Sequence, residues 1–119
     1  MKSENKKTGN RGEEMAAEYL LKKGYEIEER NFRTRFGEID IVCWDAQTLV
    51  FVEVKTKIGH DFGEPEEMVD SRKLAQVKRM GEVYLLEKRL DVPCRVDVVA
   101  IVLLEDGKPE KLEHYQAVY

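Results

Sequence analysis

Two neighbouring segments, residues 39–44 and 49–55, alternate in the manner of β-strands and constrain the fold more than any other feature. The short stretch between them permits a hairpin connection. When the hairpin is paired so that one face is fully apolar, Asp40 lies directly opposite Glu53, with Cβ atoms about 5 Å apart. A shift of one residue would turn both acids into the core, so the pattern selects this register. The apolar face then pairs Ile39 with Val54, Ile41 with Val52 and Cys43 with Val50.

Asp40, Glu53 and Lys55 form a set of charges suited to one kind of chemistry. Two opposed carboxylates repel each other, and a divalent cation would relieve that repulsion. Mg²⁺ prefers one or two carboxylates together with water and phosphate oxygens. Lys55 lies two residues beyond Glu53 on the same face, from which its ammonium can approach an attacking water and a scissile phosphate. The three residues therefore indicate metal-assisted hydrolysis of a phosphodiester bond.

An alternative is that these charges form the solvated face of an amphipathic hairpin, in which Lys55 neutralises the two acids. Against this, Trp44 and Leu49 share the predicted charged face with other apolar side chains. Charges that stand among apolar neighbours need a partner or a purpose, because their desolvation is costly. The interpretation as an active site is therefore favoured.

The rest of the chain predicts an α/β fold with the element order α-β-β-β-α-β. Gly24 ends the first helix, Asp70 or Ser71 caps the second, and a β-branched run indicates a strand covered on both faces. We expect a helix over 9–23, strands over 25–32, 39–44 and 49–55, a loop over 56–69, a helix to about residue 90, a strand over 96–104, and residues 111–119 as a candidate edge strand. The apolar helix faces comprise Met15, Ala16, Tyr19 and Leu20, then Leu74, Val77, Val83 (or Met80), Tyr84 and Leu85.

The composition is typical of a single globular domain over residues 1–119, with 42% apolar and 37% charged residues. Residues 1–8 are polar and lack a pattern, so we expect them to be disordered. No stretch approaches the roughly 20 apolar residues that a membrane span requires. The N-terminus also lacks the apolar run of a signal peptide. We therefore expect a cytoplasmic protein without a membrane partner.

The formal net charge of −4 argues neither for nor against a nucleic-acid partner. Residues 60–70 carry five acids and no Lys or Arg, whereas residues 71–95 carry seven basic residues and three acids. Arg30, Arg33 and Arg35 lie outside both stretches. An acidic centre that binds a divalent cation would also lower the total, so the charge count leaves DNA binding open.

The cysteines and histidines give weaker signals. Cys43 and Cys94 are the two cysteines, and neither belongs to a CxxC motif, so we expect both to be reduced packing residues. His60, Asp61 and Glu64 could in principle hold a metal, but loop polarity accounts for them more simply.

Two levels of resemblance follow from these residues. Asp40 followed by Glu53-Val54-Lys55 resembles the bipartite motif of the PD-(D/E)XK nuclease superfamily, although Ile39 stands where members often have proline. The wider strings resemble the YraN family of small, mostly uncharacterised bacterial proteins, which is considered similar to archaeal Holliday-junction resolvases. These strings lie between Gly9 and Ile101: GNRGEEMAAEYLLKKGY, RNFRTRFGEIDIV, LVFVEVKTK, Asp70-x-x-Lys73 and CRVDVVAI.

The resemblance implies a restriction-endonuclease-like mixed β-sheet flanked by helices, together with a set of residue roles. Asp40 and Glu53 would be ligands of Mg²⁺ or Mn²⁺, with the Val54 carbonyl as a third ligand and Glu13 completing or extending the site. Lys55 would orient or activate the attacking water and stabilise the charged transition state. Contacts to phosphates would come from Arg33, Arg35 and Lys73.

Simpler interpretations of the peripheral residues stay open. Glu13 could be an ordinary acid that the helix dipole favours in a first turn. Arg33, Arg35 and Lys73 could equally be solvated surface charges.

Together these features predict a Mg²⁺-dependent endodeoxyribonuclease acting on branched or otherwise structured DNA, with a homodimer left open. The rival hypothesis is a catalytically inactive module that retains the fold and binds nucleic acid or a protein. The enzyme is favoured because all three central residues, Asp40, Glu53 and Lys55, are present.

Overall fold

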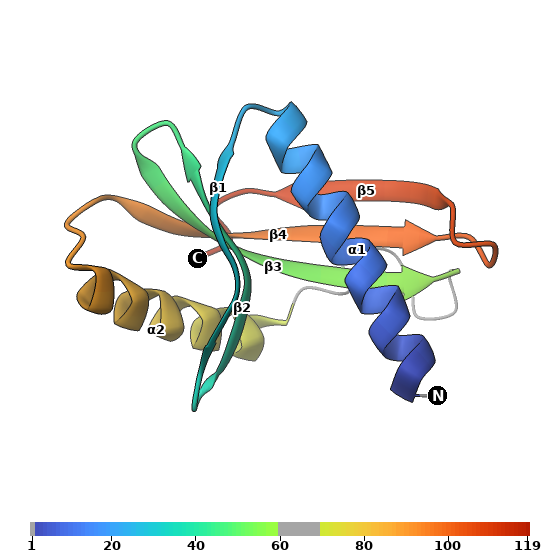
Figure 1. Ribbon diagram of the computed structural model, residues 1–119, viewed down its shortest axis with the longest axis horizontal. Coiled ribbons are helices and arrows are strands. Elements are labelled where there is room, and N and C mark those ends of the chain that lie inside the picture. The colour runs from blue at the N-terminus through green and yellow to red at the C-terminus, as the bar shows by residue number, and fades with distance from the viewer. Residues whose placement is uncertain (1, 60–69) are drawn as a thin grey trace.

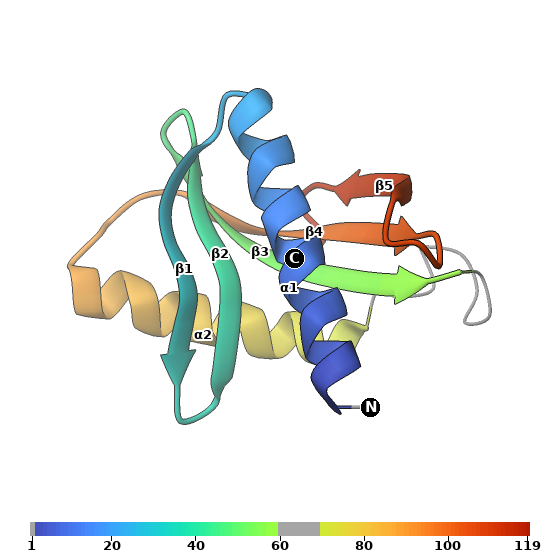
Figure 2. The same cartoon turned by 45° about the vertical axis from the view of Figure 1, so that its right-hand side comes forward.

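The computed structural model describes the backbone of residues 2–59 and 70–119, and the side chains from residue 9 onward within those ranges. One five-stranded sheet lies between two helices, α1 on one face and α2 on the other (Figures 1 and 2). The elements are α1 Lys2–Lys22, β1 Glu26–Thr34, β2 Gly37–Asp45, β3 Thr48–Ile58, α2 Ser71–Lys88, β4 Cys94–Leu103 and β5 Pro109–Tyr115. No helix among the described residues is both long and apolar enough to span a bilayer.

The strands are ordered β1-β2-β3-β4-β5 across the sheet. The first three form an antiparallel meander, α2 then carries the chain to β4, which runs parallel to β3, and β5 returns antiparallel. The predicted α/β class, with a mixed sheet flanked by helices, is confirmed, and the candidate edge strand is present as β5.

Each helix covers its own hydrophobic core. On the α1 side, Ala16 and Leu20 pack on alternate residues of β2, β3 and β4. On the α2 side, Leu74, Val77 and Tyr84 pack on the opposite set. β4 is buried along nearly its whole length, which confirms the strand covered on both faces. Burying both faces is what fixes the alternation of the central strands.

The helix ends follow the predicted signals at three of four points. Gly24, with a positive φ of 97°, follows α1, and the Asp70 side chain caps α2 by accepting the Arg72 backbone N–H. Arg89 closes α2 in the left-handed conformation. The start of α1 was predicted wrongly, because the helix begins at Lys2 and includes most of the segment expected to be disordered. That segment contains lysine and glutamate, which favour helix, and no proline to stop it.

The strand ends also extend beyond the predictions. β3 continues to Ile58, where a loop had been expected from residue 56, because the strand keeps pairing with β4 as far as Leu103. The remainder of that predicted loop, from residue 60 to 69, lies outside the described residues, as do His60, Asp61 and Glu64.

The predicted hairpin register is confirmed from Asp45–Thr48 to Ile41–Val52. Ile39 was expected on the α1 side with Ile41, but it packs in the α2 core with Phe32 and Val42. Strict alternation is therefore interrupted between Ile39 and Ile41. The interruption coincides with the end of the β2–β3 ladder, and Ile39 pairs instead with Phe32 of β1, which lies in the same core.

Cys43 and Cys94 are both free, but their environments differ. Cys43 is buried in the α1 core, and burial raises the pKa of its thiol to about 12, as expected of a packing residue. Cys94 is exposed at the start of β4, so its predicted role in packing is wrong. Its position at the strand end leaves the side chain outside both cores.

A glycine in α2 offers a test of how closely that helix must approach the sheet. A Cβ atom at Gly81 would lie 2.5 Å from Cε2 of the buried Phe51 ring. We predict that Gly81→Ala destabilises the protein by about 1–3 kcal/mol net, because overpacking outweighs the gain in helix propensity. The matched control is Gly9→Ala in α1, where a Cβ meets nothing within 4 Å. It should stabilise the protein by up to about 1 kcal/mol. Urea unfolding of both variants measures the difference, and equal midpoints would contradict the close packing of α2.

Candidate metal centre

The candidate site begins where β2 and β3 stop pairing. Asp40 and Glu53 were expected to pair directly across the hairpin, but both lie just beyond the last ladder pair, Ile41–Val52, and Asp40 contacts the backbone of Val54 instead. The half-buried Asp40 carboxylate accepts the Val54 backbone N–H through Oδ2 at 2.7 Å. Burial raises the pKa of Asp40, and the hydrogen bond from Val54 opposes the shift. The side chain thus replaces a ladder contact and holds a carboxylate between two central strands.

Glu53 is one of two buried acids among the described residues, with 5% of its surface exposed. Lys55 Nζ lies 3.7 Å from its Oε1, while Oε2 is buried without a hydrogen-bond partner among the described residues. Burial, and next the charge of Asp40, raise the pKa of Glu53 to about 7. The loose ion pair with Lys55 is therefore too weak to offset desolvation, and Glu53 lacks a full set of partners.

α1 brings a third acid to the site. Gly12 packs so closely on β3 that an added Cβ would overlap the Thr56 side chain. This approach places Glu13 beside the β2–β3 divergence, where burial, then the charges of Asp40 and Glu38, raise its pKa to about 7. The simpler interpretation was that Glu13 is an ordinary acid in the first turn of a helix. The raised pKa does not fit that interpretation, and neither does the start of α1 at Lys2.

A fourth acid, Glu38, was not predicted. Carboxylate oxygens of Glu13, Glu38 and Asp40 lie within 4.8 Å of one another. Asn31, with its amide oriented to satisfy its neighbours, donates to Glu13 Oε1 at 3.0 Å and to Glu38 Oε1 at 2.7 Å. Glu38 precedes Asp40 by two residues, so strand periodicity could have identified it. Asn31 adopts a positive φ of 57°, which strand periodicity does not foresee.

The predicted basic residues divide into two groups. Lys55 and Lys73 face the acids, since the charges of both lower the pKa of Asp40 and of Glu53 against the effect of burial. Arg33 and Arg35 lie outward, near the turn between β1 and β2. Arg33 pairs with Glu38 at 3.1 Å, and the Arg35 guanidinium stacks 4.9 Å from the centroid of the Phe36 ring.

The structure therefore gathers Asp40, Glu53, Lys55, Glu13 and Lys73 around the end of one ladder. Val54 contributes its N–H to Asp40, and a role for its carbonyl as a ligand stays a prediction. Carboxylate oxygens are the ligands that hard divalent cations prefer. A set of buried carboxylates that lacks a counter-charge is expected to have raised pKa values and unsatisfied oxygen atoms, and this group has both. The residues therefore fit a divalent cation.

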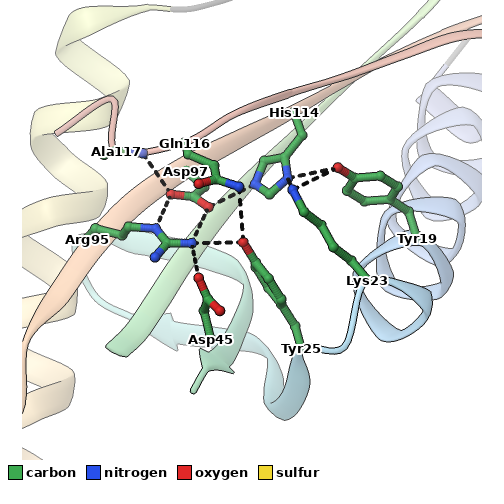
Figure 3. Close-up of polar contacts among 9 residues, drawn as sticks. All are labelled: Tyr19, Lys23, Tyr25, Asp45, Arg95, Asp97, His114, Gln116 and Ala117. Carbon is green, nitrogen blue, oxygen red and sulfur yellow. Dashed lines mark hydrogen bonds and ion pairs between the residues drawn. The ribbon is translucent and has the colours of Figure 1, made fainter. Parts of the chain in front are cut away.

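A second polar network, which the sequence did not predict, lies on the α1 side of β4 (Figure 3). The fully buried Asp97 accepts from Arg95 and from the Ala117 backbone N–H, and it lies 2.8 Å from His114 Nε2. His114 Nδ1 in turn lies 3.0 Å from the Tyr19 hydroxyl of α1. Burial raises the pKa of Asp97, but the hydrogen bonds from His114 and Arg95 outweigh it and lower the pKa overall.

This network is well satisfied, in contrast to the acidic site. Arg95 also pairs with Asp45 at 2.9 Å and donates to the Tyr25 hydroxyl at 2.8 Å. The contacts of the whole network join α1, β2, β4 and the segment after β5. The network therefore holds the C-terminal end of the chain on the sheet. We interpret it as a structural element, because its central carboxylate has a full set of donors.

Comparison with known proteins adds the family. A model described as "Uncharacterised protein family UPF0102" matches residues 12–101. The chain belongs to the UPF0102 family. A UPF0102 protein of Syntrophomonas wolfei is 50% identical over 111 residues, covering 92% of this chain and 95% of the relative. Another, from Alkaliphilus oremlandii, is 42% identical over 118 residues, covering 97% and 99%. The resemblance to the YraN family, which is this same family, is confirmed.

The raised acid pKa values predict an unusual pH dependence of stability without metal. A carboxyl whose pKa is higher in the folded state than its ordinary value of 4.5 binds its proton more tightly when folded. Its contribution to stability is therefore fully present below pH 4.5 and is lost as the pH rises to about 7. We expect Glu53→Gln to gain stability relative to wild type across this window.

Urea unfolding from pH 4 to pH 8 in a chelator measures the difference between variant and wild type. Taking the difference removes the opposite contribution of Asp97, whose pKa is lowered. Glu87→Gln, an exposed position in α2, is the matched control and should show a constant difference. A constant difference for Glu53→Gln as well would contradict a buried, proton-binding Glu53.

Proposed function

We propose that this UPF0102 protein is a divalent-metal-dependent endodeoxyribonuclease that hydrolyses phosphodiester bonds in branched or otherwise structured DNA. The observation that carries the proposal is the buried Glu53 Oε2, which has no hydrogen-bond partner in the described part of the chain and lies near Asp40 and Glu13. An acid this poorly satisfied costs stability, so a ligand that completes its partners is the simplest reason for it. The superfamily resemblance of Asp40 and Glu53-Val54-Lys55 supports the same conclusion.

Asp40 and Glu53 would hold Mg²⁺ or Mn²⁺, with Glu13 completing the donor set and Glu38 beside it. When bound, the cation would supply Lewis-acid activation and neutralise charge on the phosphate. Asn31 keeps Glu13 and Glu38 at a fixed separation through its two hydrogen bonds. The bond from Val54 does the same for Asp40, so the donors are positioned before any ligand arrives.

Lys55 is the residue we assign to the reacting groups. Its ammonium lies on the same strand as Glu53, 3.7 Å from that carboxylate, at the edge of the acidic group. From there it can orient the attacking water and stabilise negative charge that develops on the phosphate. Lys73, at the start of α2, brings a second positive charge to the same acids and would hold a neighbouring phosphate. DNA would therefore lie across the end of the β2–β3 ladder.

One observation favours the rival function, a binding module without catalysis. Asn31 and Lys55 already satisfy part of the acidic group, so the fold could tolerate these acids in the absence of a cation. The two functions differ in what metal does. Binding of a cation to the folded chain must stabilise it by mass action if the site is a metal centre.

Metal titration tests the centre directly. We predict that Mg²⁺ or Mn²⁺ raises the melting temperature of the wild type by several degrees at about 100 times the Kd. Asp40→Asn combined with Glu53→Gln should abolish this gain and be at least as stable as the wild type in a chelator, because two buried charges and their repulsion are removed. Glu87→Gln should keep the full metal response. If neither metal changes the melting temperature of the wild type, the proposed metal centre is contradicted.

Cleavage kinetics separate catalysis from binding. We predict that Lys55→Ala slows Mg²⁺-dependent cleavage by about a hundredfold or more with little change in DNA affinity, because it acts mainly in the transition state. Arg33→Ala with Arg35→Ala should instead weaken binding and flatten its dependence on salt, because fewer counterions are released. Lys22→Ala, exposed in the last turn of α1, is the matched control. If wild type and Lys55→Ala are equally inert on a panel of DNA structures while both bind DNA, the protein is the binding module.

A further inference from the structure

Phe36 is one of two strongly exposed aromatic side chains among the described residues, the other being Tyr119 at the end of the chain. Half of the Phe36 surface, 50%, is open to solvent at the turn between β1 and β2, whereas Phe32, Phe51 and Tyr84 are buried in the α2 core. An exposed phenylalanine makes no contribution to that core. Its side chain is therefore available for a ligand.

Hydrogen bonds within the turn and from α2 hold the backbone of Phe36. The Phe36 backbone N–H donates to Thr34 Oγ1 at 3.0 Å, and Gln76 of α2 donates to the Phe36 carbonyl. Gly37 follows with a positive φ of 140°, and a Cβ there would lie 3.0 Å from the Gln76 amide and 3.4 Å from Met80. The backbone of the turn is thus anchored on α2, which fixes the position from which the exposed ring projects. A rigid aromatic surface loses little entropy on binding.

One arginine lies against this ring and a second lies in the same turn region. The Arg35 guanidinium lies 4.9 Å from its centroid, and Arg33, two residues earlier, is largely exposed and pairs with Glu38. An aromatic face flanked by arginines matches the two parts of a nucleotide, a flat base and an anionic phosphate. It matches an apolar protein surface poorly, because such a surface would have to desolvate both guanidinium groups.

The ring also lies close to the acidic site along the chain. Phe36 directly precedes β2, and Asp40 is four residues further on, which spans roughly 13 Å in an extended strand. Glu38, between them, belongs to the acidic group. A nucleotide at Phe36 would therefore be within a few nucleotides of a phosphate at the metal centre.

We propose that Phe36 is a stacking platform for an unpaired nucleobase, with Arg35 and Arg33 on the adjoining phosphates. Bases within a duplex have their faces covered by neighbouring pairs, so the ring can stack on an unpaired base far more readily than on a paired one. The proposal rests on the nuclease function and narrows its substrate class to DNA with unpaired nucleotides beside the cleaved bond. Phe36 is thus a specificity residue, distinct from the groups assigned to the reaction.

Two DNAs of the same sequence test the proposal, one a blunt duplex and one with a single-stranded tail that contains 2-aminopurine. Binding is measured with Mg²⁺ in the full chain carrying Lys55→Ala, which should bind DNA and leave it intact. On this background Phe36→Leu should weaken binding of the tailed DNA by roughly tenfold and of the blunt duplex by less than about twofold. Phe36→Trp should restore the affinity. The 2-aminopurine fluorescence should change on binding to the Phe36 and Trp proteins but not to the Leu protein.

Salt dependence and melting temperature serve as controls. Phe36→Leu should leave the slope of log Kd against log salt unchanged, because no counterion is involved, whereas Arg35→Gln should reduce it. The melting temperature should stay constant, since the side chain is exposed.

Three results would overturn the proposal: equal affinity of the Phe36 and Leu proteins, equal losses on both DNAs, or a dimer that Phe36→Leu dissociates in sedimentation. The last would assign the ring to an interface between copies. Failure of the nuclease function is separate, because it is measured as cleavage by the wild type. If cleavage depends on metal but binding does not depend on Phe36, the nuclease function stands and the stacking platform is contradicted. If binding depends on Phe36 but the wild type does not cleave, the stacking platform stands and the nuclease function is contradicted.

Discussion

The hydrogen bond from the Val54 amide to the Asp40 carboxylate is the interaction on which the acidic site depends. In an uninterrupted ladder this amide would have a backbone carbonyl as its partner. Because a side chain takes it instead, pairing of β2 and β3 ends at Ile41–Val52, and a carboxylate is held between two central strands. The strands thus diverge at a point where both helices can approach, α1 with Glu13 and α2 with Lys73.

Burial, more than direct repulsion, sets the electrostatics of this group. Desolvation is the main cause of the raised pKa of Glu13, Asp40 and Glu53, and the two nearby lysines compensate only in part. The Asp97 network shows the contrast within the same sheet, since its carboxylate is more deeply buried yet has a lowered pKa. The difference is the number of donors. Asp97 accepts from several donors, whereas Glu53 Oε2 has none among the described residues and Lys55 lies 3.7 Å from Oε1. We therefore interpret the first carboxylate as structural and the second as part of a site.

Much of the fold followed from local pattern. The alternation of the two strand segments fixed the hairpin register as far as Ile41–Val52, Asp70 was one of two residues expected to cap α2, and the apolar run of β4 indicated a central strand. The errors fell where a local signal was weak or where a tertiary contact overrode it. Residues 2–8 extend α1 although they lack an apolar pattern. Ile39 lies in the α2 core, where it pairs with Phe32 of β1 and no longer with β3.

The sequence by itself determined which central residues share a strand face, because the side-chain period of two puts Glu53 with Lys55 and sets the hairpin register as far as Ile41–Val52. Tertiary structure alone decided the rest of the group. Glu13 is distant in the chain and reaches the site only because Gly12 lets α1 pack closely on β3. Asn31 joins it through a positive φ that no periodicity encodes. Spacing along a strand is a local property that residues carry with them, whereas desolvation and the meeting of separate elements exist only once the chain has folded.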